Sequence, residues 1–252
     1  MARPLAEAIG DHLIVLRSMS GQSQPFRLTL PSAFPDDLFD EVRSRVAARV
    51  QIGSLALEHL AGSHNGVRYR LKACADYSDE FTHSIKTFGD SPPLIERYQQ
   101  ERALFGFFVS GYSVLDSFSF FMHTAATQIN ATHFPMQKPG HLKGIGCKTT
   151  AGVFARPFPE EAITTELTKA IADPMFTQWD NFRNILAHRT APGRAFYASL
   201  GTSIPDPPPD WKIAPATKLK IDANLTQCRL AWLVETLAKL VSAADVFAQK
   251  HF

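Results

Sequence analysis

The sequence predicts an all-α, mainly helical protein, and three observations support this fold class. The chain has 252 residues, of which 45% are hydrophobic and 20% are charged, so one globular domain can bury a large core. A long, largely apolar stretch covers residues 94–132, and leucines recur at helical spacing through residues 222–252. Strand-like alternation occurs only in short segments of the first third of the chain. We therefore expect a bundle of four or five helices with a small N-terminal β hairpin or an irregular extension.

Two short β-rich runs mark the N-terminal extension, which we assign to residues 1–33. Residues 12–17 read HLIVLR, and in residues 26–30 apolar residues alternate with Arg27 and Thr29. The polar segment between the two runs would form the turn of a small hairpin.

The first helix is expected from Asp36 to about His59. Acidic residues in its first turn suit the positive end of the helix dipole. After Asn65-Gly66, apolar and basic residues alternate over residues 67–72. This alternation predicts a strand with one cationic face, which is either a solvated edge strand or an RNA-contacting surface.

One long helix is expected from Leu94 to about Thr132. Its segment from Ala103 to Met122 is long enough to span a membrane. Asp116 lies near the middle of that segment, where an aspartate costs about 2.5–3.5 kcal/mol on insertion scales. We therefore interpret the segment as the buried central helix of a soluble, cytoplasmic bundle with no membrane contact.

The rest of the chain alternates helices with two long loops, and we treat residues 1–252 as a single domain. Residues 133–157 are rich in glycine, proline and lysine, and residues 193–221 contain five prolines. The first loop, with Lys138, Lys143 and Lys148, is either a simple solvated loop or a lid that contacts phosphate. The helices expected here cover about 159–172, a segment that begins at Asp173-Pro174, and a segment from about Asp222 to the C-terminus.

The net charge and the positions of the cysteines limit the classes of function that the chain can have. A net charge of only +2 means that any surface for RNA must be local. Cys74, Cys147 and Cys228 are far apart and form no Cys-x-x-Cys motif, so we interpret them as reduced cytoplasmic thiols. Glu80 and His83 form a single Glu-x-x-His pair, whereas a di-metal bundle needs two. We expect neither a metal site nor a cofactor.

The segment Arg-Asn-Ile-Leu-Ala-His lies in the helix that begins at Asp173-Pro174. At about 100° per residue, Arg183, Asn184 and His188 share one polar arc, which also includes Asp180. Histidine can move protons near neutral pH, and arginine can hold the charge that develops on a phosphate during phosphodiester cleavage. The 2′-hydroxyl of RNA can act as the nucleophile, so this chemistry requires no metal. The apolar residues of the segment fall on the opposite side: Trp179, Phe182, Ile185 and Leu186.

Arg183, Asn184 and His188 fill an Arg-polar-x-x-x-His pattern, and in this respect the chain resembles HEPN domains. The resemblance covers the six motif residues and a compatible helical layout over roughly residues 94–252. It implies a HEPN-like bundle, usually a homodimer, in which two motifs face each other and form one metal-independent RNA-cleaving site. Many such proteins are toxins, defence proteins or RNA-processing nucleases, and others are inactive. The partners that the resemblance implies are RNA, a second copy of the chain, and an antitoxin or a nucleotidyltransferase-type protein.

The resemblance also assigns roles to the motif residues. His188 would be the general acid/base, Arg183 would stabilise the phosphate, and Asn184 would orient the site by hydrogen bonding. Asp180, on the same arc, would support them. These roles describe a metal-independent endoribonuclease. Two alternatives stay open: a non-catalytic HEPN-like module that binds RNA, nucleotide or a protein partner, and a helical bundle with no nucleic-acid role.

A polar stripe on the long central helix supplies further candidates. Tyr112, Asp116, Ser119 and His123 lie at positions i, i+4, i+7 and i+11, which line up along one face. Buried polar side chains need hydrogen-bond partners, so we expect the stripe to face the motif helix, with Asp116 orienting Arg183 or His188. The alternative is that the stripe makes structural hydrogen bonds or lines a wet dimer groove.

Overall fold

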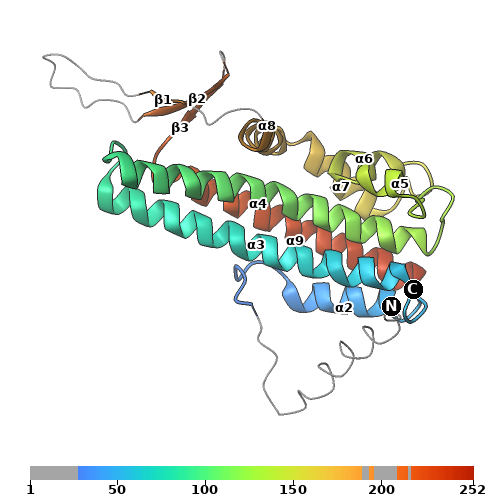
Figure 1. Ribbon diagram of the computed structural model, residues 1–252. Helices are drawn as coiled ribbons and strands as arrows, with labels where there is room; N and C mark the ends of the chain where they lie inside the picture. Colours follow the sequence, from blue (N-terminus) through green and yellow to red (C-terminus); the bar gives the residue numbers. More distant parts are fainter. Residues whose placement is uncertain (1–27, 189–192, 196–208, 215–216) are drawn as a thin grey trace, which may run out of the picture.

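The computed structural model describes residues 28–188, 193–195, 209–214 and 217–252. Within these ranges it contains eight helices and three short strands, which confirms the mainly helical fold class (Figure 1). The helices are α2 (Asp36–Ala47), α3 (Leu55–Phe88), α4 (Leu94–Thr127), α5 (Pro139–Lys143), α6 (Cys147–Phe154), α7 (Ala162–Ala172), α8 (Pro174–His188) and α9 (Leu225–His251). The strands are β1 (Gly193–Ala195), β2 (Asp210–Ala214) and β3 (Thr217–Lys220).

The two 34-residue helices α3 and α4 form the centre of the molecule. They pack side by side along their lengths, with α9 behind them and α2 against α9 (Figure 1). The shorter helices α6 and α8 contact α4, and α7 joins them to α9. The motif helix therefore lies directly on the central helix, as the polar stripe led us to expect.

Glycines on α4 allow its neighbours to approach closely. A Cβ atom at Gly111 would overlap the indole of Trp179 on α8 and would lie 3.0 Å from the sulfur of Cys74 on α3. A Cβ atom at Gly106 would overlap the ring of Tyr77 on α3. The absence of a side chain at these two positions sets the spacing of α4 from α3 and α8.

Aromatic side chains fill the core between α4 and the shorter helices. The ring of Trp179 packs against Phe107 and Phe108, with centroids 4.8 and 5.2 Å away, and the ring of Phe182 lies 4.7 Å from Phe108. All four side chains are almost completely buried. The apolar face predicted for the motif helix thus packs inward, because α4 offers it a matching aromatic surface.

The predicted first helix is divided in two. α2 ends at Ala47, and α3 begins at Leu55 after the N-cap Ser54, whose side chain accepts a hydrogen bond from the N–H of Leu57. Gly53, between the helices, has φ of +75°, a conformation that favours glycine. The prediction of one helix from Asp36 to His59 was therefore wrong.

The strand predicted over residues 67–72 was also wrong, because the segment is the interior of α3. Val67 and Leu71 are buried four residues apart on the core side of this helix. The three basic residues do not share one face, because Arg70 lies about 200° around the helix from both Arg68 and Lys72. Arg68 instead pairs with Asp36 of α2 at 2.9 Å.

The described chain has eight helices rather than four or five, because the predicted first helix is divided in two and one predicted loop carries two short helices. Residues 133–157 contain α5 and α6, and the described parts of residues 193–221 form the antiparallel sheet β1-β2-β3. Prolines exclude helix there but permit short strands that flank them. The predicted N-terminal hairpin lies mostly outside the described residues, and residues 28–30 carry no regular structure.

The central helix α4 is long and apolar enough, by length and composition, to cross a bilayer. Of its most apolar segment, 67% is buried inside the protein. α4 ends at Thr127, where the threonine hydroxyl bonds the carbonyl oxygens of His123 and Phe134, and not at Thr132 as predicted.

Candidate functional site

Helix α8 is anchored at its start by Asp173. One carboxylate oxygen accepts the N–H of Met175 at 2.7 Å, and the other accepts the indole N–H of Trp232 on α9 at 3.0 Å. The first bond caps α8, and the second ties its N-terminus to the bundle. With Trp179 and Phe182 buried against α4, the rotation of α8 is set, and its polar arc faces away from the core.

Four side chains form a continuous chain of polar contacts on this arc. The Nζ of Lys148, on α6, lies 2.7 Å from Oδ2 of Asp180. Asn184 donates from Nδ2 to Oδ1 of Asp180 at 2.9 Å, and it accepts at Oδ1 from Nη1 of Arg183 at 2.8 Å. Asn184 thereby holds the guanidinium of Arg183 in a defined position.

Two residues of the α4 stripe complete this cluster. The guanidinium carbon of Arg183 lies 5.3 Å from the ring centroid of Tyr112, which is within cation–π range. Asp116 is one turn further along α4, and its Oδ1 accepts the backbone N–H of Cys147 at the start of α6, at 3.3 Å. We call Tyr112, Asp116, Lys148, Asp180, Arg183 and Asn184 the Arg183 cluster.

The pKa values of Asp180, Asp116 and Tyr112 are shifted in different directions. Burial would raise the pKa of Asp180, but hydrogen bonds from Lys148 and its neighbours outweigh burial and hold that pKa below its ordinary value. Burial raises the pKa of Asp116, and the Cys147 N–H and the charge of Arg183 only partly offset it. Burial and the two nearby carboxylates also raise the pKa of Tyr112, so its hydroxyl keeps its proton at neutral pH.

Neither of the two histidine candidates can be placed in this cluster: His123 lies apart from it, and the side chain of His188 is outside the described part. α8 ends at His188, and the side chain of His188 is outside the part that the structure describes. His123 is buried with its ring 5.2 Å from that of Phe134, and burial lowers its pKa. It is eleven residues beyond Tyr112, which places it roughly 16 Å further along α4. The residues of the stripe therefore lie in two different environments. Tyr112 and Asp116 lie near α8, whereas His123 packs against the segment after α4.

Two cations near the site were not among the predicted site residues. Lys148 belongs to a segment that was predicted as a loop, so its direction could not be inferred. Arg70 was placed on a strand, whereas on α3 its Nη1 donates to Oγ of Ser117 at 2.8 Å, close enough for its charge to act on Asp116. A helical reading of residues 67–72 would have been needed to find it.

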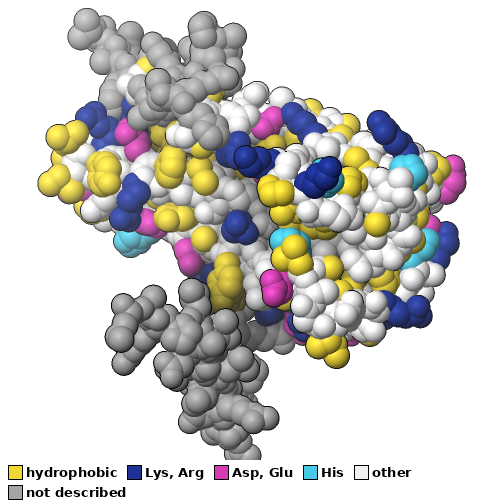
Figure 2. Space-filling view, turned by 45° about the vertical axis from the view of Figure 1, so that its right-hand side comes forward, with side chains coloured by type: hydrophobic (Ala, Val, Ile, Leu, Met, Phe, Trp, Pro, Cys, Tyr) yellow, Lys and Arg dark blue, Asp and Glu magenta, His cyan; other side chains and the backbone are white. Residues whose placement is uncertain are grey.

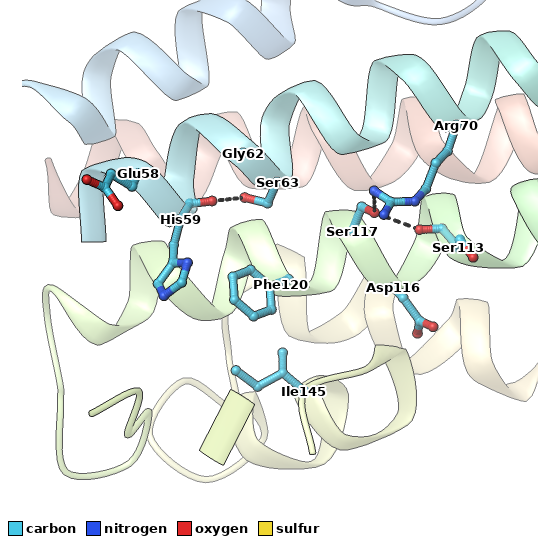
Figure 3. Close-up of a pocket in the computed structure, with 10 residues that line it drawn as sticks. All are labelled: Glu58, His59, Gly62, Ser63, Arg70, Ser113, Asp116, Ser117, Phe120 and Ile145. Carbon is cyan, nitrogen blue, oxygen red and sulfur yellow. Dashed lines mark hydrogen bonds between the residues drawn. The ribbon is translucent and has the colours of Figure 1, made fainter. Parts of the chain in front are cut away.

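An open groove continues from Asp116 between α3, α4 and the α5–α6 connection (Figure 3). Its volume is about 420 Å³. Residues from all three segments line it, among them His59, Gly62, Arg70, Asp116, Phe120 and Ile145. Because Asp116 belongs both to the Arg183 cluster and to the groove, the two form one continuous surface.

The cluster and the groove together carry balanced charge. Three cations, Arg70, Lys148 and Arg183, stand against three carboxylates: Glu58, Asp116 and Asp180. Over the face drawn in Figure 2, basic, acidic and apolar side chains are interspersed. Among the described residues, no group of three or more His, Cys, Asp or Glu side chains is arranged to hold a metal ion.

Comparison with known proteins identifies no relative of this chain. No family model, no curated protein and no solved structure matches the chain. The functional argument therefore depends on the motif residues and on the geometry of the Arg183 cluster.

Proposed function

We propose that this chain is a HEPN-like, metal-independent endoribonuclease that acts as a homodimer. The observation that carries the proposal is the hydrogen-bonded chain from Lys148 through Asp180 and Asn184 to Arg183 on the outer face of α8. Such a chain fixes a guanidinium at the surface of a rigid helix. A preoriented guanidinium is suited to hold a phosphate whose negative charge grows during cleavage.

The proposed reaction assigns a proton-transfer role to His188. The 2′-oxygen of RNA attacks the adjacent phosphorus and loses its proton to a base, the bond from phosphorus to the 5′-oxygen breaks, and an acid protonates that leaving oxygen. The products are a 2′,3′-cyclic phosphate and a 5′-hydroxyl. One copy of the motif supplies one histidine for these two proton transfers, which favours a site completed by His188 of a second copy.

Within this proposal, Asn184 and Asp180 position Arg183. Hydrogen bonding to Asn184 uses one of the five N–H donors of the Arg183 guanidinium, and the others can reach a phosphate. Asp180 in turn holds the Asn184 amide so that its oxygen faces the guanidinium. Asp180 stays ionised at neutral pH because Lys148 and its neighbours lower its pKa despite burial.

The test is RNA cleavage in the presence of EDTA. The wild-type protein should produce fragments with cyclic phosphate ends, and Arg183→Ala and His188→Ala should each reduce the rate by about 100-fold or more. Arg49→Ala removes an exposed arginine from the connection after α2 and should leave the rate unchanged. The nuclease proposal fails if diverse RNAs stay intact, or if both motif variants cleave as fast as the wild type.

A non-catalytic RNA-binding module is the second candidate, and one observation favours it. Arg183, Asn184, Asp180 and Lys148 are already linked to one another, an arrangement that can hold a phosphate without transferring protons. In that case Arg183→Ala would weaken RNA binding in a fluorescence anisotropy titration, while no RNA fragments would form with any variant.

A further inference from the structure

The groove that starts at Asp116 has features of a nucleotide site. Its volume of about 420 Å³ lies within the ordinary range for small-ligand sites. It is bounded by polar groups at both ends and by aromatic and aliphatic surface between them (Figure 3). From Ser113 to Phe120 it follows seven residues of α4, roughly 10 Å, which suits a nucleotide and not a duplex.

We propose that this groove binds one nucleotide of single-stranded RNA next to the phosphodiester held by Arg183, and that it prefers a base with an exocyclic amino group. The inference rests on the proposed function for the identity of the polymer. It goes further by naming a second binding site and a base preference.

The Arg70 end of the groove suits a phosphate. Arg70 is exposed, and its hydrogen bond to Ser117 orients the guanidinium along the groove wall (Figure 3). Ser117 is itself held by the carbonyl oxygen of Ser113 at 2.7 Å. Arg70 and Arg183 are both close enough for their charges to act on the carboxyl of Asp116, so two cations lie near this point of the surface and can contact neighbouring phosphates of one strand.

The opposite end suits a base. The rings of His59 and Phe120 are half-buried there and meet edge to face, with centroids 5.3 Å apart. RNA-binding proteins commonly stack unpaired bases on such aromatic side chains.

Glu58 sets the direction of the nucleotide and the base preference. It lines the aromatic end and would repel a phosphate there, whereas at the other end the charges of Arg183 and Arg70 act against that of Asp116. Glu58 can also accept a hydrogen bond from an amino group of adenine, cytosine or guanine. Uracil has no exocyclic amino group, so it should bind most weakly.

The experiment measures anisotropy of fluorescein-labelled 8-mers of 2′-O-methyl A, C and U, which cannot be cleaved because the 2′-oxygen is blocked. We expect the A and C oligomers to bind about tenfold or more tightly than the U oligomer, the discrimination that a good base contact gives. Arg70→Gln should weaken all three oligomers and reduce the magnitude of the slope of log K against log salt by about one.

Gly62→Phe tests the groove itself. A Cβ atom at Gly62 meets no atom within 4 Å, so a large side chain can be added there without displacing the core. It should weaken binding of the A oligomer by about tenfold, the scale of one lost base-stacking contact. Gly152→Phe is the matched control, because Gly152 has equal space on α6 and does not line the groove; it should bind like the wild type.

The groove proposal and the nuclease proposal can fail separately. Equal binding of A and U oligomers, or wild-type binding by a folded Gly62→Phe variant together with an unchanged salt slope for Arg70→Gln, overturns the groove assignment. If unmodified RNA is still cleaved in that case, the nuclease proposal stands. If binding depends on Gly62 and Arg70 but RNA is never cleaved, the groove assignment stands and the nuclease proposal fails.

Discussion

Two aspartates of the Arg183 cluster show how burial and neighbouring groups together determine the pKa of a carboxyl group. Asp116 and Asp180 are both carboxylates near Arg183, yet their pKa values shift in opposite directions. Asp180 has Lys148 at 2.7 Å, whereas the hydrogen bond to Asp116 comes from a backbone N–H. A close cation therefore offsets the burial of one carboxylate, and a backbone amide does not fully offset the burial of the other.

Asp116→Asn should separate stability from activity. Because the folded-state pKa of Asp116 is raised, its charged form destabilises the fold above that pKa, and Asn should increase the free energy of unfolding at neutral pH. The increase should shrink as pH falls through the raised folded pKa and disappear below the unfolded value of about 3.9. Urea titrations at several pH values measure it.

The same variant should cleave RNA more slowly, because Asp116 no longer carries the charge that interacts with Arg183. Wild-type cleavage together with wild-type stability would mean that Asp116 neither positions Arg183 nor bears a burial penalty. Asp180→Asn should have the opposite effect on stability, because the pKa of Asp180 is lowered in the folded protein. The variant should be less stable than the wild type above the unfolded pKa, and this difference should vanish as pH falls through the folded pKa.

The packing of helices against one another positions these residues, and α4 is packed closely against both α3 and α8. Gly111 faces both Trp179 on α8 and Cys74 on α3, so one position controls the spacing of three helices. α8 then presents Arg183 over Tyr112 of the same central helix. The position of the guanidinium thus depends on helix packing several residues away.

Gly111→Ala should destabilise the protein. The added Cβ atom overlaps Trp179, and overpacking of this kind costs about 1–3 kcal/mol, more than the gain of roughly 0.5–1 kcal/mol from replacing a helical glycine. Gly62→Ala is the control within α3, where the new methyl group meets nothing and only the gain should remain. Thermal or urea unfolding compares them, and equal stabilisation by both variants would contradict the packing argument.

Prediction from sequence succeeded for helices whose apolar pattern extends over several turns, and it failed for one short segment. The apolar runs of α4 and α9 extend over many helical turns. The polar arc of α8 has four predicted residues, and the structure places three of them as expected; the side chain of His188 lies outside the described part. Residues 67–72 span less than two turns, and Val67 and Leu71 fit both a strand of period two and a helix with i, i+4 spacing. Only packing against α4 distinguishes the two.

For the whole molecule, the proposed chemistry requires two copies of the chain. Light scattering should give twice the monomer mass of 27.9 kDa at concentrations where RNA is cleaved. Dilution below the dissociation constant of the dimer should lower the activity per chain, because each copy contributes one motif histidine. Full activity per chain in a species shown to be monomeric would contradict a shared site.

Local physics in the sequence alone determined the mainly helical class, the extent of the central and last helices to within a few residues, and the arc that groups Asp180, Arg183 and Asn184. These properties depend on periodicity within one helix, which the order of residues specifies directly. Tertiary structure decided that Lys148 pairs with Asp180, that Tyr112 lies under Arg183, and that Arg70 and Asp116 share a groove. Those contacts join residues 32 to 71 positions apart, and only the packing of α3, α4, α6 and α8 brings them together.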